Sequence, residues 1–197
     1  MDQSDFDPAG YRPSPNQLRQ AEVLLELLRR CGEANVQVSL IGGYGLDALY
    51  GQLTRDHHDF DLLVEAGSRN TLVKILMDLG YENVPARNDP RRRKEEYVKR
   101  GSEDDYEVEF VTLDSAALAY YAQQFGFRPD MALLFPSEPN GQLLGQLMHA
   151  ATLEGVEMID QVQQHNAREL GWRAYKHQEH HAMLLDLLRR RRYCLCR

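Results

Sequence analysis

Two short runs follow one another in an informative order: Leu40-Ile41-Gly42-Gly43-Tyr44-Gly45 and, further on, His58-Asp59-Phe60-Asp61-Leu62-Leu63-Val64. The first predicts a strand that passes through a tight glycine turn into a helix, and the second predicts another strand that carries two acids. Side chains two positions apart in a strand point to the same face, about 6–7 Å from each other. We therefore expect Asp59 and Asp61 to share one face, while Phe60, Leu62 and Val64 anchor the other face in the core.

Two carboxylates at this separation favour a bound cation. They repel each other by roughly 2–3 kcal/mol at an effective dielectric constant near 20. Mg²⁺ prefers oxygen ligands and usually completes its coordination shell with water and substrate phosphates. The pair Asp59 and Asp61 is thus suited to holding a complex of Mg²⁺ with a triphosphate.

Gly42 and Gly43 supply a complementary feature. Residues without a Cβ let a ligand approach the backbone closely, and the amides at a helix N-terminus favour phosphate oxygens. A pair of glycines alone usually marks a plain turn, and an isolated Asp-x-Asp is usually the solvated end of a strand. Their occurrence together, in a strand–turn–helix–strand order, is much more specific.

The rest of the chain predicts an α+β (α/β) protein, in which helices flank a mixed β-sheet and a helical segment follows. Apolar spacing predicts helices over 15–32, from Leu46 to Tyr50, and over 68–79 and 116–124, and a helical region from Thr152 onward. Strands are expected over 36–41, 60–64, 81–84, 95–99 and 106–113, and the prolines and glycine from Pro129 to Gly141 predict an irregular crossing. We divide the chain into a flexible lead-in (1–14), a core (15–114) and a mainly helical C-terminal region packed on the core (115–197).

Composition narrows the class of function. The 197 residues are 43% hydrophobic and 27% charged, as in an ordinary globular protein, and the formal net charge is -7. This acidity does not favour a nucleic-acid partner, because nonspecific binding depends on clustered Lys and Arg. Three cysteines without metal-ligand spacing, an acidic N-terminus and the lack of a long apolar run predict a cytoplasmic protein without a membrane anchor.

The two runs, extended to Ile41–Gly51 and Thr54–Leu62, resemble the antibiotic nucleotidyltransferases of the DNA polymerase β-like superfamily. The pattern is most similar to the aminoglycoside 2''-nucleotidyltransferases and the small lincosamide nucleotidyltransferases. The resemblance is clear over residues 36–65 and fainter up to residue 114. It implies transfer of a nucleoside monophosphate from a nucleoside triphosphate, with ATP the first expectation, to an acceptor hydroxyl, assisted by one or two Mg²⁺ ions.

The resemblance also implies residue roles. By position, the triphosphate cradle corresponds to Gly42, Gly43 and Tyr44, and the metal ligands correspond to Asp59 and Asp61. The family adds a third acid on a later strand, as metal ligand or general base. Val108-Glu109-Phe110-Val111 fits that pattern best, so we prefer Glu109, with Glu107 as its rival. Phe60 stands where the family has an aliphatic residue, and glutamate stands where relatives often have aspartate.

Several basic residues are further candidates. Arg55 and His57 precede the acid pair, as Arg and often His do in the family, and Arg55 either contacts phosphate or a carboxylate or lies in a surface loop. Asp47 occupies the position of an acid on the family's helix, where capping or contact with Arg55 is expected. Lys176 resembles a basic residue that some relatives place near the nucleotide on a C-terminal helix, and its alternative is a solvated helix face. The Arg91–Lys94 cluster is a candidate for binding an anion, and its alternative is a charged loop.

The sequence does not identify the acceptor. It could be an aminoglycoside- or lincosamide-like small molecule. Toxin-like members of the superfamily instead nucleotidylate RNA or protein, although the acidic composition disfavours RNA. A third hypothesis is a regulatory module that binds a nucleotide without turnover; the presence of all three acid positions argues against it.

Overall fold

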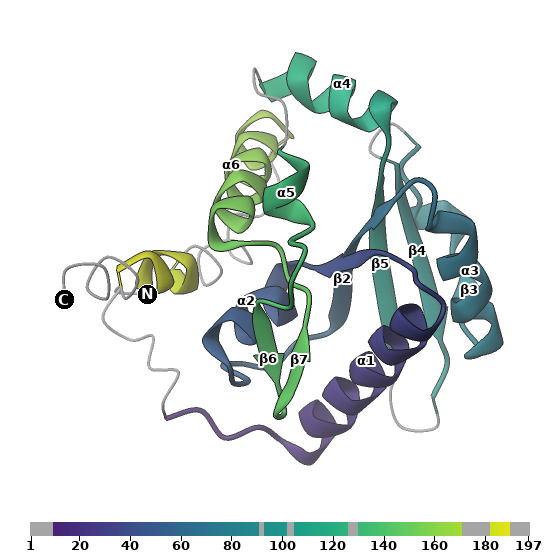
Figure 1. The fold of residues 1–197 in the computed structure, drawn as a ribbon, viewed down its shortest axis with the longest axis vertical. Helices are drawn as coiled ribbons and strands as arrows, with labels where there is room; N and C mark the ends of the chain where they lie inside the picture. Colours follow the sequence, from purple (N-terminus) through teal and green to yellow (C-terminus); the bar gives the residue numbers. More distant parts are fainter. Residues whose placement is uncertain (1–9, 91–92, 102–104, 126–129, 171–181, 190–197) are drawn as a thin grey trace.

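The structure is a computed structural model that describes residues 10–90, 93–101, 105–125, 130–170 and 182–189. Its centre is a five-stranded sheet in the order β1-β2-β5-β4-β3 (Figure 1). The strands are β1 (Val38–Leu40), β2 (Asp59–Glu65), β3 (Glu82–Asn83), β4 (Lys94–Lys99) and β5 (Tyr106–Leu113). β2 and β5 are parallel and the other neighbours are antiparallel, so the predicted mixed sheet and the α+β class are confirmed.

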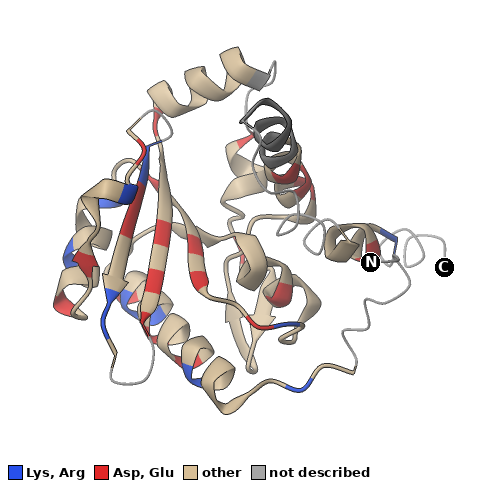
Figure 2. Ribbon diagram, turned by 180° about the vertical axis from the view of Figure 1, so that it is seen from behind, with Lys and Arg blue, Asp and Glu red and all other residues tan. Residues whose placement is uncertain are grey.

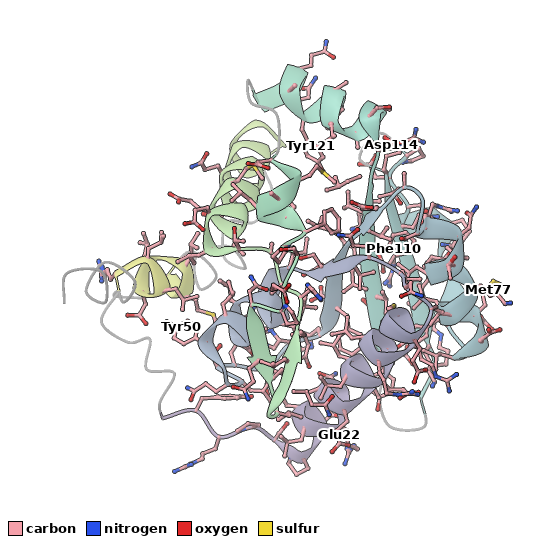
Figure 3. All side chains as sticks on the ribbon, viewed as in Figure 1. Glu22, Tyr50, Met77, Phe110, Asp114 and Tyr121 are labelled. Carbon is pink, nitrogen blue, oxygen red and sulfur yellow. The ribbon has the colours of Figure 1, made fainter. Side chains whose placement is uncertain are left out.

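One face of the sheet packs against α1 (Pro15–Glu33) and α3 (Arg69–Asp78). The core on this face contains Phe60 and Leu62 of β2, Phe110 of β5, Leu24 of α1 and Leu72 of α3, all at most 2% exposed. Figure 3 labels Phe110 inside the molecule and Met77, which is 64% exposed, at its outer surface. Because strand residues alternate between faces, burial of these apolar residues leaves the acids of β2 and β5 on the other face.

The glycine turn joins β1 to α2 (Gly42–Tyr50), the short helix that the sequence predicted. α1 begins at Pro15 after the N-cap Ser14, whose Oγ accepts a hydrogen bond from the Gln17 backbone N at 3.1 Å. α2 ends at Gly51, which has a left-handed backbone with φ 79°. A 3₁₀ turn over Pro85–Arg87 connects β3 to β4.

The C-terminal region contains a β-hairpin that the sequence did not predict. After α4 (Ser115–Phe125) and α5 (Met131–Leu134), the strands β6 (Gly141–Leu143) and β7 (Gln146–Met148) pair antiparallel, before α6 (Leu153–Leu170). Leu144 and Gly145, with φ 47° and 80°, form its two-residue turn. Strands of three residues are too short to show a period of two, and leucine is not a typical residue for this turn.

α5 and α6 cover one end of the face of the sheet opposite α3, whereas the hairpin packs against α2 and belongs to the same core cluster as α1 and α3 (Figure 1). A second apolar cluster joins Leu63 of β2 and Leu113 of β5 to Leu134, Val156 and Met183. Met183 belongs to a helical stretch over residues 182–189. This cluster buries one end of that face. The end that carries the β2 acids lies outside the cluster. In the described part of the chain, no helix is long and apolar enough to cross a membrane.

Candidate active site

Four carboxylates lie in two adjacent pairs on one face of the sheet. In the parallel register of β2 and β5, Asp59 is beside Glu107 and Asp61 is beside Glu109. Glu96 of β4 stands directly opposite Glu109 and is 7% exposed. Figure 2 shows these acidic positions side by side on neighbouring strands. The alternation of strand side chains therefore gathers the predicted acids, and both Glu107 and Glu109 are among them.

The glycine turn lies against the β2 acids. Gly42 has φ 65°, and a Cβ placed on it would stand 2.7 Å from the Asp61 Cγ. The Ile41 backbone N, just before the turn, donates to the Asp61 carbonyl oxygen at 2.9 Å. No side chain larger than hydrogen fits at residue 42, so the backbone of the turn and the Asp61 carboxylate form one continuous surface.

Two basic side chains contact the β4 and β5 acids. Lys94 forms an ion pair with Glu109, and Arg87 pairs with Glu96 and with Glu107, the latter at 3.1 Å. Burial raises the pKa of the Glu109 carboxyl above its usual range, the Lys94 ammonium opposes that rise, and the charges of Asp59 and Glu96 add to it. Lys94 thus moderates the electrostatic repulsion within the acid group.

The Arg91–Lys94 cluster was a candidate for binding an external anion. Its two described members contact carboxylates of the chain itself: Lys94 binds Glu109, and Arg93 binds Asp114 at 3.0 Å. Lys94 is the first residue of β4 rather than part of a charged loop, so its side chain lies on the acid face. Residues 91–92 lie outside the described part of the chain.

Asp47 of α2 is fully buried and contacts residues other than Arg55. His57 Nε2 lies 2.6 Å from Asp47 Oδ2, and Thr54 Oγ1 donates to Asp47 Oδ1. Among the described residues, these hydrogen bonds of Asp47 do not include Arg55, so the predicted contact between Asp47 and Arg55 is wrong. An acid between Leu46 and Ala48 in an apolar helix indicates that Asp47 is buried and needs a polar partner. The sequence did not indicate which residue that partner would be.

The family of the chain is shown by its match to the family model for aminoglycoside-2''-adenylyltransferase, which covers residues 23–183. The chain belongs to this family. No curated protein sequence matches it. The aminoglycoside-2''-adenylyltransferase match includes the turn, both acid strands and most of the C-terminal region.

Solved structures share the fold. A crystal structure of ANT(2'')-Ia in complex with adenylyl-2''-tobramycin has a TM-score of 0.60 at 16% identity, covering 86% of this chain and 90% of that chain. Lincomycin-bound LnuA, a lincosamide antibiotic adenylyltransferase, has a TM-score of 0.50 at 18% identity, covering 71% and 83%. An antigenic nucleotidyltransferase-like protein from Paracoccidioides brasiliensis has a TM-score of 0.53 at 17% identity, covering 86% and 76%. The family-model match and the shared fold confirm the predicted resemblance to the aminoglycoside 2''-nucleotidyltransferases.

In this member of the aminoglycoside-2''-adenylyltransferase family, Tyr44 contributes its side chain to the core. The ring is 1% exposed, its hydroxyl accepts a hydrogen bond from Gln17 Nε2 at 2.8 Å, and it packs against His57 and Phe60. Only the backbone of Tyr44 is therefore available to a ligand at the turn.

Arg55 lies next to the turn. A Cβ on Gly43 would stand 2.9 Å from Arg55 Nη2, and Arg55 Nη1 donates to the Asp56 carbonyl oxygen at 3.2 Å. Its Nε is buried and has no hydrogen-bond partner among the described residues. A buried donor without a partner favours a ligand oxygen at this position. Lys176 lies outside the described residues.

A polar cavity of about 350 Å³ opens beside Glu107, the one of the four carboxylates that lines it. Its lining includes Glu107 of β5, His57 and His58 just before β2, and Gln17 and Gln20 of α1. Glu107 is therefore open to a small polar molecule from this cavity.

The donor set fits a divalent cation through the β2 pair. Asp59 and Asp61 share a face, and the Asp61 carboxylate lies at the glycine turn, where a triphosphate would complete the coordination shell. Among the described residues, no three His, Cys, Asp or Glu side chains are grouped so that they alone could hold a metal ion. The fit is thus to a metal held by two aspartates together with substrate phosphates.

Proposed function

We propose that the chain transfers a nucleoside monophosphate, AMP in the first place, from a nucleoside triphosphate to a hydroxyl of a small-molecule acceptor. The observation that carries the proposal is the placement of Asp59, Asp61 and Glu109 on one face, with the Gly42-Gly43 turn against Asp61. Family membership supports the same reaction class. The acceptor class is that of the two structural relatives, an aminoglycoside- or lincosamide-like molecule.

In the proposed reaction, the acceptor oxygen attacks the α-phosphorus in line with the leaving group. The new O–P bond forms as the bond to pyrophosphate breaks, and the hydroxyl proton passes to Glu109, or to Glu107 if that residue is the base. Asp59 and Asp61 would hold Mg²⁺, which neutralises charge that develops on the phosphoryl oxygens. The backbone amides at the start of α2 would orient the leaving phosphates.

The raised pKa of Glu109 favours it as the proton acceptor. A carboxylate in a partly buried site holds a proton more readily than one in water, which brings its basicity closer to that needed for general base catalysis near neutral pH. Glu107 instead lines the open polar cavity and pairs with Arg87. Its position suits contact with the acceptor.

The test is direct. Purified protein is incubated with Mg²⁺ and each of four α-labelled nucleoside triphosphates, in the presence of tobramycin, lincomycin, tRNA or a protein mixture. We expect label on one of the two antibiotic classes and release of pyrophosphate. Label on tRNA or protein alone would contradict the small-molecule proposal, and nucleotide binding without any transfer would favour the regulatory hypothesis.

A further inference from the structure

A buried carboxylate–imidazole pair lies beside the glycine turn and has no part in the proposed chemical step. Asp47 is 0% exposed and His57 is 4% exposed. Asp47 Oδ2 lies 2.6 Å from His57 Nε2, and Asp47 Oδ1 accepts the Thr54 hydroxyl. Burying a charged or polar pair away from water is costly, so the presence of this pair is weak evidence for a contribution to net stability.

Two further contacts fix His57, one to its backbone and one to its ring. The His57 backbone N donates to Gln17 Oε1 at 3.0 Å, and the ring centroid lies 4.4 Å from that of Tyr44. Gln17 Nε2 in turn donates to the Tyr44 hydroxyl. Contacts from α1, α2 and the loop before β2 therefore leave the ring one position.

The remaining edge of the imidazole touches the turn itself. A Cβ on Gly43 would collide with His57 Nδ1 and Cε1. Because Nε2 faces Asp47, Nδ1 is the nitrogen that faces Gly43. Gly43 and Asp47 stand four residues apart on α2, hence on the same side of the helix. The contacts run from Asp47 through His57 back to the first turn of the same helix.

We propose that Asp47 and His57 are positioning residues for the nucleotide: Asp47 fixes the ring with a proton on Nε2, and the ring fixes the backbone of Gly43 so that the amides of the turn face the phosphates. The inference rests on the proposed use of this turn as the triphosphate site. Neither side chain contacts the reacting atoms in this scheme.

Nucleotide affinity distinguishes positioning from a merely structural role. If the pair only stabilises the fold, its loss lowers the fraction of folded protein, so that apparent kcat falls while the Kd and KM for nucleotide stay the same. If the pair orients the turn, the folded variant binds nucleotide more weakly.

The experiment measures the Kd of a fluorescent ATP analogue with Mg²⁺ for the full chain. We expect Asp47→Asn and His57→Gln each to raise this Kd by about tenfold or more. The double variant should bind no more weakly than the weaker single variant, because Asp47 acts through His57. Thr54→Val is the matched control, since it removes the other hydrogen bond of the same carboxylate, and its Kd should stay within about twofold of wild type.

Nitrogen chemical shifts of His57 give a second, independent measure. Wild type should show the proton on Nε2, and Asp47→Asn should weaken that preference. The inference is overturned if either folded variant keeps the wild-type Kd, or if Thr54→Val weakens binding as much as the other two. If Asp47→Asn does not fold, the Kd of His57→Gln alone decides.

The outcomes separate this inference from the proposed function. A wild-type protein that transfers nucleotide, with variants that bind as tightly as wild type, contradicts only the positioning role. A wild-type protein that binds the analogue without transfer, with variants that bind about tenfold more weakly, contradicts only the proposed reaction. Failure of wild type to bind any nucleotide analogue contradicts both.

Discussion

The Asp61 carboxylate lies directly against Gly42, so that a Cβ at residue 42 would stand 2.7 Å from the Asp61 Cγ. This contact joins the two halves of the sequence pattern, the glycine turn and the acid pair, into one surface. Any side chain at residue 42 must displace either the backbone of the turn or the carboxylate. The proposed nucleotide site depends on both.

Gly42→Ala should therefore inactivate the protein. Its positive φ costs about 1 kcal/mol for alanine, and the displacement of Asp61 should lower kcat/KM by roughly 100-fold. The matched control is Gly145→Ala in the hairpin turn, where φ is 80° and nothing lies within 4 Å of the added Cβ. Thermal unfolding should show a loss for both variants, larger for Gly42→Ala because its Cβ also collides with Asp61, and only Gly42→Ala should lose transfer. Equal activity of the two variants would contradict the close-contact argument.

The two glutamates of β5 can be told apart by substitution. If Glu109 is the general base, Glu109→Gln should lower kcat by roughly 100- to 1,000-fold with little change in nucleotide binding. Glu107→Gln should mainly raise the KM for the acceptor, because Glu107 lines the open cavity. Steady-state kinetics measure both effects, with the acceptor that the labelling experiment identifies. The reverse pattern would assign the base to Glu107.

The pH profile should reflect the raised pKa of Glu109. A base must be unprotonated, so activity should fall, as the pH is lowered, through a value above the ordinary pKa of a glutamate. Lys94→Met removes the ammonium that opposes the rise, and should move this acid limb of kcat/KM to still higher pH.

Arg69→Met is the control for that shift. It removes an ion pair with Glu95, on the other face of β4, and should leave the acid limb in place. A Lys94→Met profile that coincides with that of wild type would show that Glu109 does not set the limb.

Core packing predicts a separate effect on stability. Leu62 is 0% exposed between the sheet and its helices, and Leu62→Ala should lower the free energy of unfolding by about 2–5 kcal/mol. Leu147 of the hairpin is 72% exposed, and Leu147→Ala should change the free energy of unfolding by less than about 0.5 kcal/mol. Urea unfolding followed by circular dichroism measures both. A small effect at Leu62 would contradict the assignment of the core face.

Much of the sheet followed from the sequence because β2 and β5 alternate between acidic and apolar residues over their first halves. Phe60 and Leu62 had to face the core, which placed Asp59 and Asp61 together, and Tyr106 to Leu113 repeated the pattern. Because the register puts Asp59 beside Glu107 and Asp61 beside Glu109, both glutamates lie next to the acid pair of β2. The sequence therefore could not choose between them, and the choice between them stays a prediction.

Other features depend on contacts between residues that lie far apart in the sequence, which a local sequence pattern does not predict. The pairing of Asp47 with His57 spans nine intervening residues, from the last turn of α2 to the loop before β2, and Gln17 reaches His57 from a different helix. Lys94 contacts Glu109 only because β4 begins at that residue, whereas the neighbouring arginines suggested a charged loop. The hairpin over residues 141–148 was missed because its strands are too short to show periodicity.

The most direct test replaces Asp59 and Asp61, the two aspartates proposed to bind the metal, one at a time. Asp59→Asn and Asp61→Asn keep the size of each side chain and remove its charge, so the fold should persist by circular dichroism while transfer of labelled AMP to the acceptor falls by at least about 100-fold. A folded Asp59→Asn or Asp61→Asn protein that transfers nucleotide at near wild-type rate would contradict the claim that this pair forms the catalytic centre.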